Sequence, residues 1–438
     1  MLAASGGRSM HDVIIIGGGF AGLSAAALLS RRGQRVLLVE QASLLGGRAA
    51  YFEEDGFVWQ YGQHSHRLAR DGIAAQLFER LGEPLDFIDT RGADAYLYID
   101  GRLHPRPEGP LDFLRTRLLP WRSRLTLLRL LAKMLRARPD EWYNRSLLDF
   151  YRTWFSDGHV ERLLSFLGFT IMAPDPTLAS AGEVIEFMQR AAKAKVKQGE
   201  PRGGSKQVID TLTRVAAEHD CALHLSERVD RIVIKDKRAV GVETNGGRYE
   251  ARHIVFAAPV FHLFEVAEEQ HFDPAFVTYA KGIESSRGLS IDFVFDEPVT
   301  TIKGGIIGVD VPLWVKFQTN IDPTVAPPGK HVHTWGMLFP FGAPLTSRTV
   351  AQTEARMKAI MEEVMPGALG KVVRERKLVI PVINANVLKP SQSYPHRPEV
   401  VCKDVDGLYL IGDTTRVHGC SGDLSFASAM ALTDSIGG

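Results

Sequence analysis

Cysteine, net charge and long apolar runs are all scarce in this 438-residue chain. Its three cysteines are too few and too scattered for a disulfide framework, and no C-x-x-C redox pair is present, which favours a reducing compartment. With 52 basic and 51 acidic residues the formal net charge is +1, so no global field attracts nucleic acid and we expect no nucleic-acid partner. Residues 1–11 lack the apolar core of a signal peptide, and no run reaches the roughly 20 apolar residues that span a bilayer. We therefore expect a cytoplasmic protein.

What the chain does contain is a strand–turn–helix pattern near its start. Val13 to Ile16 form a short apolar run that is typical of a strand buried on both faces. Gly17, Gly19 and Gly22 then give G-x-G-x-x-G, which permits a tight turn, the approach of a pyrophosphate and close helix packing, respectively. This order predicts a dinucleotide site, with a purely structural glycine turn as the alternative.

The residues after these glycines extend the pattern. Phe20 and Ala21 open a run of small or apolar helix formers, whose free N–H groups would face the phosphates. A second apolar strand, residues 36–39, ends on Glu40, and Gln41 follows it. The Glu40 carboxylate can accept both ribose hydroxyls and would repel a 2′-phosphate, which argues against NADP. We place these residues in the cofactor site.

Gly46, Gly47 and Arg48 follow shortly after the second strand. At this point the chain resembles the flavin-dependent amine oxidase and phytoene desaturase superfamily, whose fingerprint continues into G-G-R. The resemblance implies FAD as the cofactor, with both glycines passing close to it and the arginine meeting its pyrophosphate or flavin side. An arginine fork suits a phosphate on general grounds too.

Residues 56–64 are similar to the phytoene desaturase-like branch, which includes carotenoid- and squalene-associated members. In that branch this backbone passes the flavin ring, which implies that Gly62, Gln63 and His64 contact the cofactor. His64 is also a candidate catalytic residue, with an ordinary polar residue on a turn as the alternative. Gln60 replaces the aspartate that is usual in the family.

The C-terminal residues 407–424 resemble the second flavin motif of the family, followed by its H-P-G-G-G-I-P sequence. In relatives the aspartate of this motif bonds the ribityl chain, and the following loop borders the flavin. A backbone pair on a middle strand holds the adenine. The resemblance thus implies further cofactor contacts from Val229, Gly412, Asp413, Gly422, Asp423 and Leu424.

Asp423 is the residue that we expect to transfer a proton beside the flavin. It opens the last predicted helix, where the helix dipole would stabilise an ionised carboxylate and so favour a base. The alternative is that Asp423 only caps this helix.

The resemblance implies an α/β fold with a Rossmann-like, glutathione-reductase-like FAD-binding domain built from discontinuous segments. We assign residues 1–104, 201–262 and 396–438 to this domain. Residues 105–200 would form a helical cap insert, and residues 263–395 would complete an α+β substrate domain.

A basic amphipathic helix is predicted over residues 122–138. Residues 110–138 hold eight basic residues and one acid, Asp112. Such a segment is typical either of a membrane surface element or of a core helix with a solvated basic face. We expect Arg122, Arg129, Lys133 and Arg136 on one side, and Leu127, Leu128, Leu131, Met134 and Leu135 on the other. The membrane reading would make the protein peripheral on the inner face of a membrane.

Three functions fit this sequence. The first is a desaturase, or a related isomerase or dehydroxylase, acting on an isoprenoid or carotenoid-type lipid. The second is an amine oxidase that produces an imine and hydrogen peroxide, and the third is a non-catalytic flavoprotein. Amine oxidases carry a lysine where this chain has Ser290 and an aromatic residue where it has Asp423. We expect non-covalent FAD, because Cys402 lies too close to Gly407 to match the linking cysteine of relatives, and we expect no metal.

Overall fold

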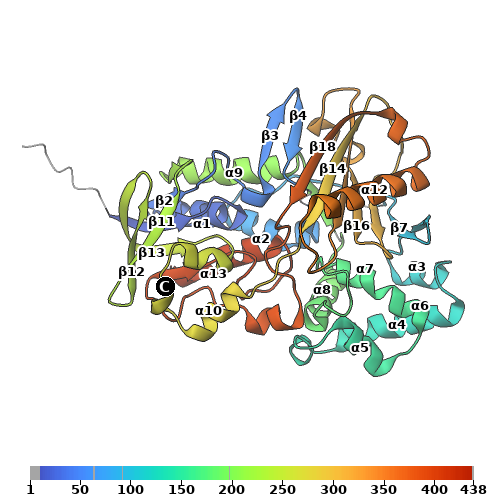
Figure 1. The fold of residues 1–438 in the computed structure, drawn as a ribbon, viewed down its shortest axis with the longest axis horizontal. Helices are drawn as coiled ribbons and strands as arrows, with labels where there is room; N and C mark the ends of the chain where they lie inside the picture. Colours follow the sequence, from blue (N-terminus) through green and yellow to red (C-terminus); the bar gives the residue numbers. More distant parts are fainter. Residues whose placement is uncertain (1–9, 63–64, 91, 197, 437–438) are drawn as a thin grey trace, which may run out of the picture.

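The computed structural model describes residues 10–62, 65–90, 92–196 and 198–436, which form two large sheets with helices around them (Figure 1). The strands of the first sheet are β1 (His11–Ile16), β2 (Val36–Val39), β10 (Ala222–His224), β11 (Val229–Lys235), β12 (Arg238–Thr244), β13 (Gly247–Phe256) and β19 (Leu408–Leu410). Their order is β10-β2-β1-β13-β12-β11, and β19 pairs with β13. Strands β10, β2, β1, β13 and β19 are parallel. This confirms the predicted α/β class with a cofactor domain assembled from separated segments.

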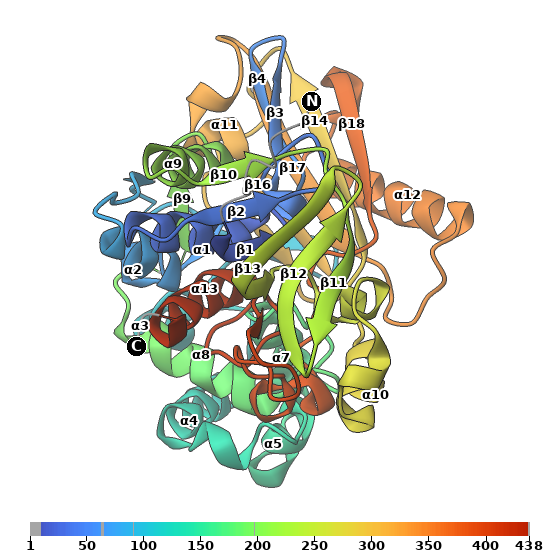
Figure 2. The same ribbon diagram turned by 90° about the vertical axis from the view of Figure 1, so that its left-hand side faces the viewer.

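Three helices cover one face of this sheet (Figure 2). Helix α1 (Phe20–Arg31) packs against both α9 (Ser205–Glu218) and α13 (Asp423–Ile436). The packing needs a glycine at position 22, because a Cβ there would lie 1.9 Å from the Gly17 carbonyl oxygen. The spacing of the three glycines therefore fixes how closely α1 approaches β1.

The second sheet has the order β18-β14-β17-β16-β15-β7-β8. Its strands are β7 (Tyr96–Ile99), β8 (Arg102–Pro105), β14 (Gly288–Phe295), β15 (Ile306–Gly308), β16 (Leu313–Phe317), β17 (His331–Leu338) and β18 (Val372–Ile380). Strand β7 lies within residues 1–104, which the sequence assigns to the cofactor domain, yet it pairs with β15 here. The chain thus enters the second sheet before residue 105.

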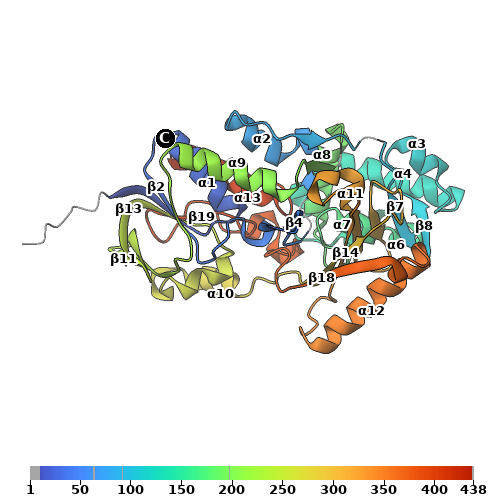
Figure 3. The same cartoon turned by 90° about the horizontal axis from the view of Figure 1, so that it is seen from above.

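The two faces of the second sheet differ in chemistry. Alternate residues of β14, β16 and β17 form an apolar core with helix α12 (Ser347–Val364), which lies on one side of the sheet (Figure 3). The opposite face carries buried polar side chains, and their charges are paired: Arg376 with Asp292 at 2.7 Å, and Lys316 with Glu200. This polar face contacts Gln60 at the end of β4 (Phe57–Gln60) and Glu200 in β9 (Gln198–Pro201), the strand that follows the insert.

The helical insert packs at the other side of the second sheet from α12 (Figure 3). Its helices are α3 (Pro110–Arg115), α4 (Trp121–Arg136), α5 (Leu147–Trp154), α6 (Gly158–Arg162), α7 (Leu164–Phe169) and α8 (Ala181–Lys193). No helix of the described residues is long and apolar enough to cross a membrane.

Helix α4 buries much of the side that the sequence predicted, since Leu127 and Met134 are buried and Leu128 is half-buried. Its buried residues are Ser123, Leu127, Leu130 and Met134, whereas Leu135 is 46% exposed. The prediction differs from the structure at two positions, because it omitted the buried Leu130 and included the exposed Leu135. The apolar residues on this helix cover more than half of its circumference, so the sequence alone left the phase open.

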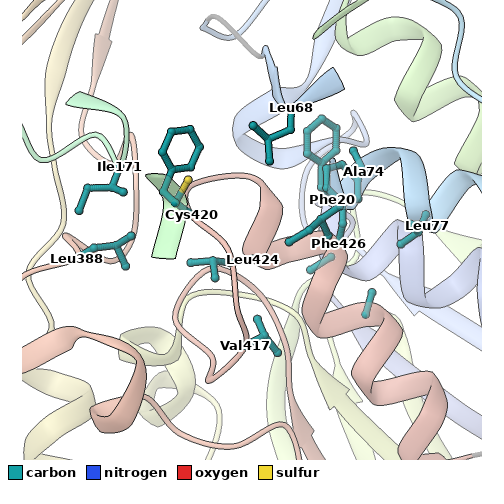
Figure 4. Close-up of a cluster of buried hydrophobic side chains, with 14 of the residues drawn as sticks. Phe20, Leu68, Ala74, Leu77, Ile171, Leu388, Val417, Cys420, Leu424 and Phe426 are labelled. Atoms are coloured by element: carbon teal, nitrogen blue, oxygen red, sulfur yellow. The ribbon is translucent and has the colours of Figure 1, made fainter. Parts of the chain in front are cut away.

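The remaining elements connect these layers. They are β3 (Tyr51–Glu54), β4 (Phe57–Gln60), β5 (His66–Arg67), α2 (Ile73–Arg80), β6 (Phe87–Ile88), β9 (Gln198–Pro201), α10 (Pro274–Lys281) and α11 (Gln318–Ile321). A buried apolar cluster joins α1, α2 and α13 with the loop before α13 (Figure 4). Within it the rings of Phe20 and Phe426 lie 5.1 Å apart. This cluster holds the starts of α1 and α13 in fixed relative positions.

Candidate flavin-binding site

The starts of α1 and α13 face a common cleft with about 600 Å³ of empty volume, part of it open solvent. Eight residues that the sequence placed in the cofactor site line it, and they come from three distant stretches of the chain. They are Gly19, Phe20, Ala21, Gly46, Arg48, Gly412, Asp413 and Gly422.

Glycines shape the space inside this cleft. A Cβ on Gly19, Gly412 or Gly422 would meet no protein atom within 4 Å and would therefore project into open space. Three glycines that are not required for packing thus keep the lining free for a ligand, which is what a dinucleotide needs where backbone approaches its phosphates. The residues present fit FAD.

The loop with Gly46 and Gly47 braces the first glycine motif. Gly46 N donates to Gly18 O at 2.7 Å, and both Gly46 (φ +103°) and Gly47 (φ +56°) adopt left-handed backbone. A Cβ on Gly47 would lie 3.3 Å from the Gly19 Cα. Gly47 therefore supports the cleft from behind.

Glu40 is buried at the end of β2, beside the glycine motif. Its Oε2 accepts from Gly18 N at 2.6 Å and its Oε1 from Ala42 N at 2.8 Å. The carboxylate thus holds the turn in shape, and its oxygens keep lone pairs for ribose hydroxyls. The Glu40 carbonyl accepts from Glu227 N at 2.9 Å, two residues before β11 begins at Val229, and neither Glu40 nor Val229 is among the residues that line the cleft. Gln41 is exposed and does not line the cleft.

Arg48 and Asp413 form a two-pronged ion pair across the cleft wall. Arg48 Nη1 and Nη2 donate to the two Asp413 oxygens at 2.8 Å each, and Ala385 N donates to Asp413 Oδ2 at 2.9 Å. Burial would raise the pKa of Asp413, but the guanidinium and the backbone N–H outweigh it and hold the pKa below its ordinary value. Asp413 is thus an ionised acceptor of fixed orientation. The sequence predicted both residues as ligands, but not this contact between them.

The segment expected beside the flavin ring is only partly described. Gln63 and His64 lie outside the described residues, and Gly62 is described with φ +97°. Gln60, whose role the sequence left open, accepts from Ser205 N at 3.0 Å through Oε1. It therefore bonds the N-terminus of α9, a role that an aspartate could also fill.

Asp423 is buried behind the cleft and is not one of the residues that line it. Burial raises its pKa to about 6, although Arg190, 3.8 Å away, and Arg67 oppose the rise. The expectation that the helix dipole keeps it ionised was therefore incomplete, because desolvation dominates. Among the described residues its Oδ2 has no hydrogen-bond partner. Leu424 lies in the apolar core.

A second contact ties the loop before α13 to the helical insert. The His418 ring stacks on Tyr394 at 4.2 Å between centroids, and His418 Nδ1 lies 3.0 Å from Glu186 Oε2 on α8. Glu186 raises the pKa of His418. No sequence signal links these residues, because more than 200 positions separate Glu186 from His418.

Eight lining residues were missed by the sequence analysis. They are Ala49, Ala257, Ala258, Pro259, Ile383, Asn384, Ser421 and Ser425. The stretch after β13 could have been found, because β13 runs parallel to β1 and the carboxyl ends of parallel strands meet at one edge. Asn384 carries no motif that would have identified it.

Comparisons with known proteins agree with this geometry. The family described as flavin containing amine oxidoreductase matches residues 20–421. The phytoene dehydrogenase of Streptomyces griseus is 26% identical, over 85% of this chain and 82% of the relative. The all-trans-zeta-carotene desaturase of Myxococcus xanthus is 24% identical, over 94% and 90%. An oxidoreductase structure from Methanosarcina mazei has a TM-score of 0.81 and 21% identity, covering 97% of this chain and all of the other.

The family match runs from the start of α1 to the loop before α13, so it includes both stretches that open onto the cleft, and the glycine lining of the cleft fits FAD. The chain therefore belongs to the flavin containing amine oxidoreductase family and is an FAD-dependent oxidoreductase.

Proposed function

We propose that this enzyme is a desaturase, or a related isomerase or dehydroxylase, of a hydrophobic isoprenoid of the carotenoid type. One observation carries the proposal: two carotenoid-modifying relatives align with 85% and 94% of the chain, which is more than the cofactor-domain segments alone contain. Similarity limited to the cofactor motifs would support only flavin binding.

The second sheet supports the same conclusion against amine oxidation. Ser290, at the place of the amine oxidase lysine, lies on β14 opposite Gly336 and is 1% exposed. The charged Lys316 on the same face is neutralised by Glu200. No lysine in this part of the described sheet is thus free to hold a water beside a flavin.

The chain's own residues orient the cofactor and keep water out. Bound FAD supplies the redox chemistry. The Arg48–Asp413 pair offers a fixed acceptor, and the start of α13 offers its positive end to the cleft. Asp423, behind this helix start, can hold a proton near neutral pH because its pKa is raised to about 6.

FAD is held without a covalent bond in this proposal. All three cysteines are free and buried. Cys420, the nearest to the cleft in sequence, points its Sγ at Thr170 O at 3.7 Å, and burial raises its pKa to about 12. Burial also raises the pKa of Cys402. Thiols in this state are poor nucleophiles.

The test is anaerobic reduction of the FAD-loaded protein. Phytoene or ζ-carotene in liposomes should bleach the flavin, or change isomer composition without bleaching, and desaturation should shift the polyene absorbance to longer wavelength. Putrescine and other amines should leave the flavin oxidised. Bleaching by amines with hydrogen peroxide formed in air would establish the amine oxidase instead, and no reaction with any polyene or amine would favour a non-catalytic flavoprotein.

A further inference from the structure

Asn384 is a buried amide in the wall of the cofactor cleft with one half of its hydrogen-bonding capacity unused. Its side-chain oxygen accepts from Ser421 Oγ at 2.8 Å. Its Nδ2 has no partner among the described residues, although the residue is only 7% exposed. A buried donor left without a partner is costly, so each such group in a folded protein calls for an explanation.

The surroundings hold this amide at the cleft. The Asn384 backbone N–H donates to Ser286 Oγ at 3.1 Å, and the next N–H, of Ala385, donates to Asp413. Ser421 adopts a left-handed backbone with φ +53°, which is uncommon for a residue other than glycine. Asn384 and Ser421 both line the cleft, so a strained residue and an unpaired amide meet at one place.

The terminal torsion of an asparagine is soft, so the amide can turn toward an acceptor without leaving its pocket. Ser421 Oγ can bond only one of the two amide atoms, whichever way the amide is turned. The other amide atom is therefore left without a partner among the described residues.

We propose that Asn384, positioned by Ser421, is a cofactor-binding residue whose amide donates to an acceptor atom of the flavin ring. The cleft at this point is bounded by the start of α13, and bound FAD is the group that would pair the amide. Its role is to bind the cofactor and tune its potential, separately from any proton transfer.

Asn386 offers a matched control two residues along the chain. It is 4% exposed, comparable to Asn384, but its amide is satisfied within the protein. Its Nδ2 donates to Gln392 O at 3.1 Å, and its Oδ1 accepts from Gln392 Nε2 at 2.8 Å. Loss of this amide should affect the fold and leave the cofactor unaffected.

The experiment compares N384A, N384D and N386A with the unaltered full-length protein. FAD affinity is measured by titrating apoprotein with FAD, the flavin midpoint potential by equilibration with a reference dye, and apoprotein stability by thermal melting. We expect N384A to weaken FAD binding about 2- to 10-fold, the range for one neutral hydrogen bond, with little change in apoprotein melting. N384D should lower the midpoint potential, since a carboxylate disfavours an electron-rich flavin. N386A should lower the apoprotein melting temperature and leave affinity and potential unchanged.

Two results would overturn the proposal. One is N384A with unaltered FAD affinity and potential. The other is an N384A variant with a lower apoprotein melting temperature and unchanged FAD affinity and potential, as expected for N386A. That result would make the Asn384 amide purely structural. Because no substrate is used, neither result depends on whether the enzyme acts on a carotenoid.

Discussion

At the scale of single residues, desolvation decides the protonation of Asp423. Its carboxyl is buried behind the start of α13, and the Arg190 guanidinium at 3.8 Å only partly offsets the loss of water. The pKa is raised from 3.8 to about 6. Asp423 is therefore protonated more readily in the folded protein than in the unfolded chain, which makes its contribution to stability depend on pH.

The sign of that dependence follows from proton binding. Below pH 4 the Asp423 carboxyl is protonated in both the folded and the unfolded state, so its burial does not lower the free energy of unfolding through ionisation. Between pH 4 and 6 the unfolded chain binds fewer protons than the folded one, so the free energy of unfolding falls as pH rises, and above pH 6 the full penalty is present. D423N, which cannot ionise, should then be more stable than the unaltered protein at pH 8 by about 2–3 kcal/mol and nearly equal to it at pH 4.

Urea unfolding at both pH values measures this difference. A D423N variant with the same stability as the unaltered protein at pH 8 would contradict the raised pKa. If Asp423 also transfers a proton, stopped-flow reduction of the D423N flavin should be slower by ~10²-fold or more. Reduction at the unaltered rate would leave Asp423 with a structural role alone.

At the scale of elements, α3 and α4 combine exposed apolar side chains with unpaired cations. Leu111, Leu114, Trp121 and Leu125 are 63%, 43%, 64% and 41% exposed, respectively. Arg122 and Arg129 make no ion pair within the described part of the chain. A core helix with a solvated face would not need exposed tryptophan and leucine, so we propose that this surface docks on an anionic membrane from which a lipid substrate is drawn.

Binding to vesicles tests this docking surface. Each cation near an anionic leaflet contributes about 1 kcal/mol, so R122Q/R129Q should lower binding to anionic vesicles by about 2 kcal/mol, or roughly 30-fold. L125S should also weaken binding, because it removes an inserted side chain. L225S is the matched control, since Leu225 is likewise 41% exposed but follows β10 in the cofactor domain. An equal loss of vesicle binding in L125S and L225S, or vesicle binding that is insensitive to salt, would count against membrane docking by this surface.

At the scale of the whole molecule, short sequence patterns predicted the cofactor domain. They did not predict contacts between residues that lie far apart in the sequence. The glycine motif, α1 and Glu40 lie within 30 residues of one another, so spacing alone was sufficient to place them together. The Arg48–Asp413 pair joins positions 365 apart, and Asn384 reaches the cleft from a segment without any motif. The buried side of α4 was predicted only in part, because its limits depend on which neighbouring helices pack against it.

One long-range contact tests whether the insert and the cofactor domain fold together. Glu183 on α8 pairs with Arg397 at 2.9 Å, and both side chains are almost wholly buried, at 2% and 0% exposure. Glu183 also accepts from Tyr394 N at 2.7 Å, so the pair fastens the insert to the segment that leads into β19. Burial raises the pKa of Glu183, and Arg397 opposes this rise.

Replacing one partner should leave the other charge buried and alone. R397M should lower the free energy of unfolding by about 3–5 kcal/mol, whereas E183L/R397M should recover much of the loss, since apolar side chains can replace a buried pair. Urea unfolding followed by both far-UV circular dichroism and flavin fluorescence provides the measurement. Because the pair joins the two parts, both signals should shift together in R397M. If the flavin signal kept its original midpoint while the circular dichroism shifted, the insert would unfold independently of the cofactor domain, and the pair would not couple them.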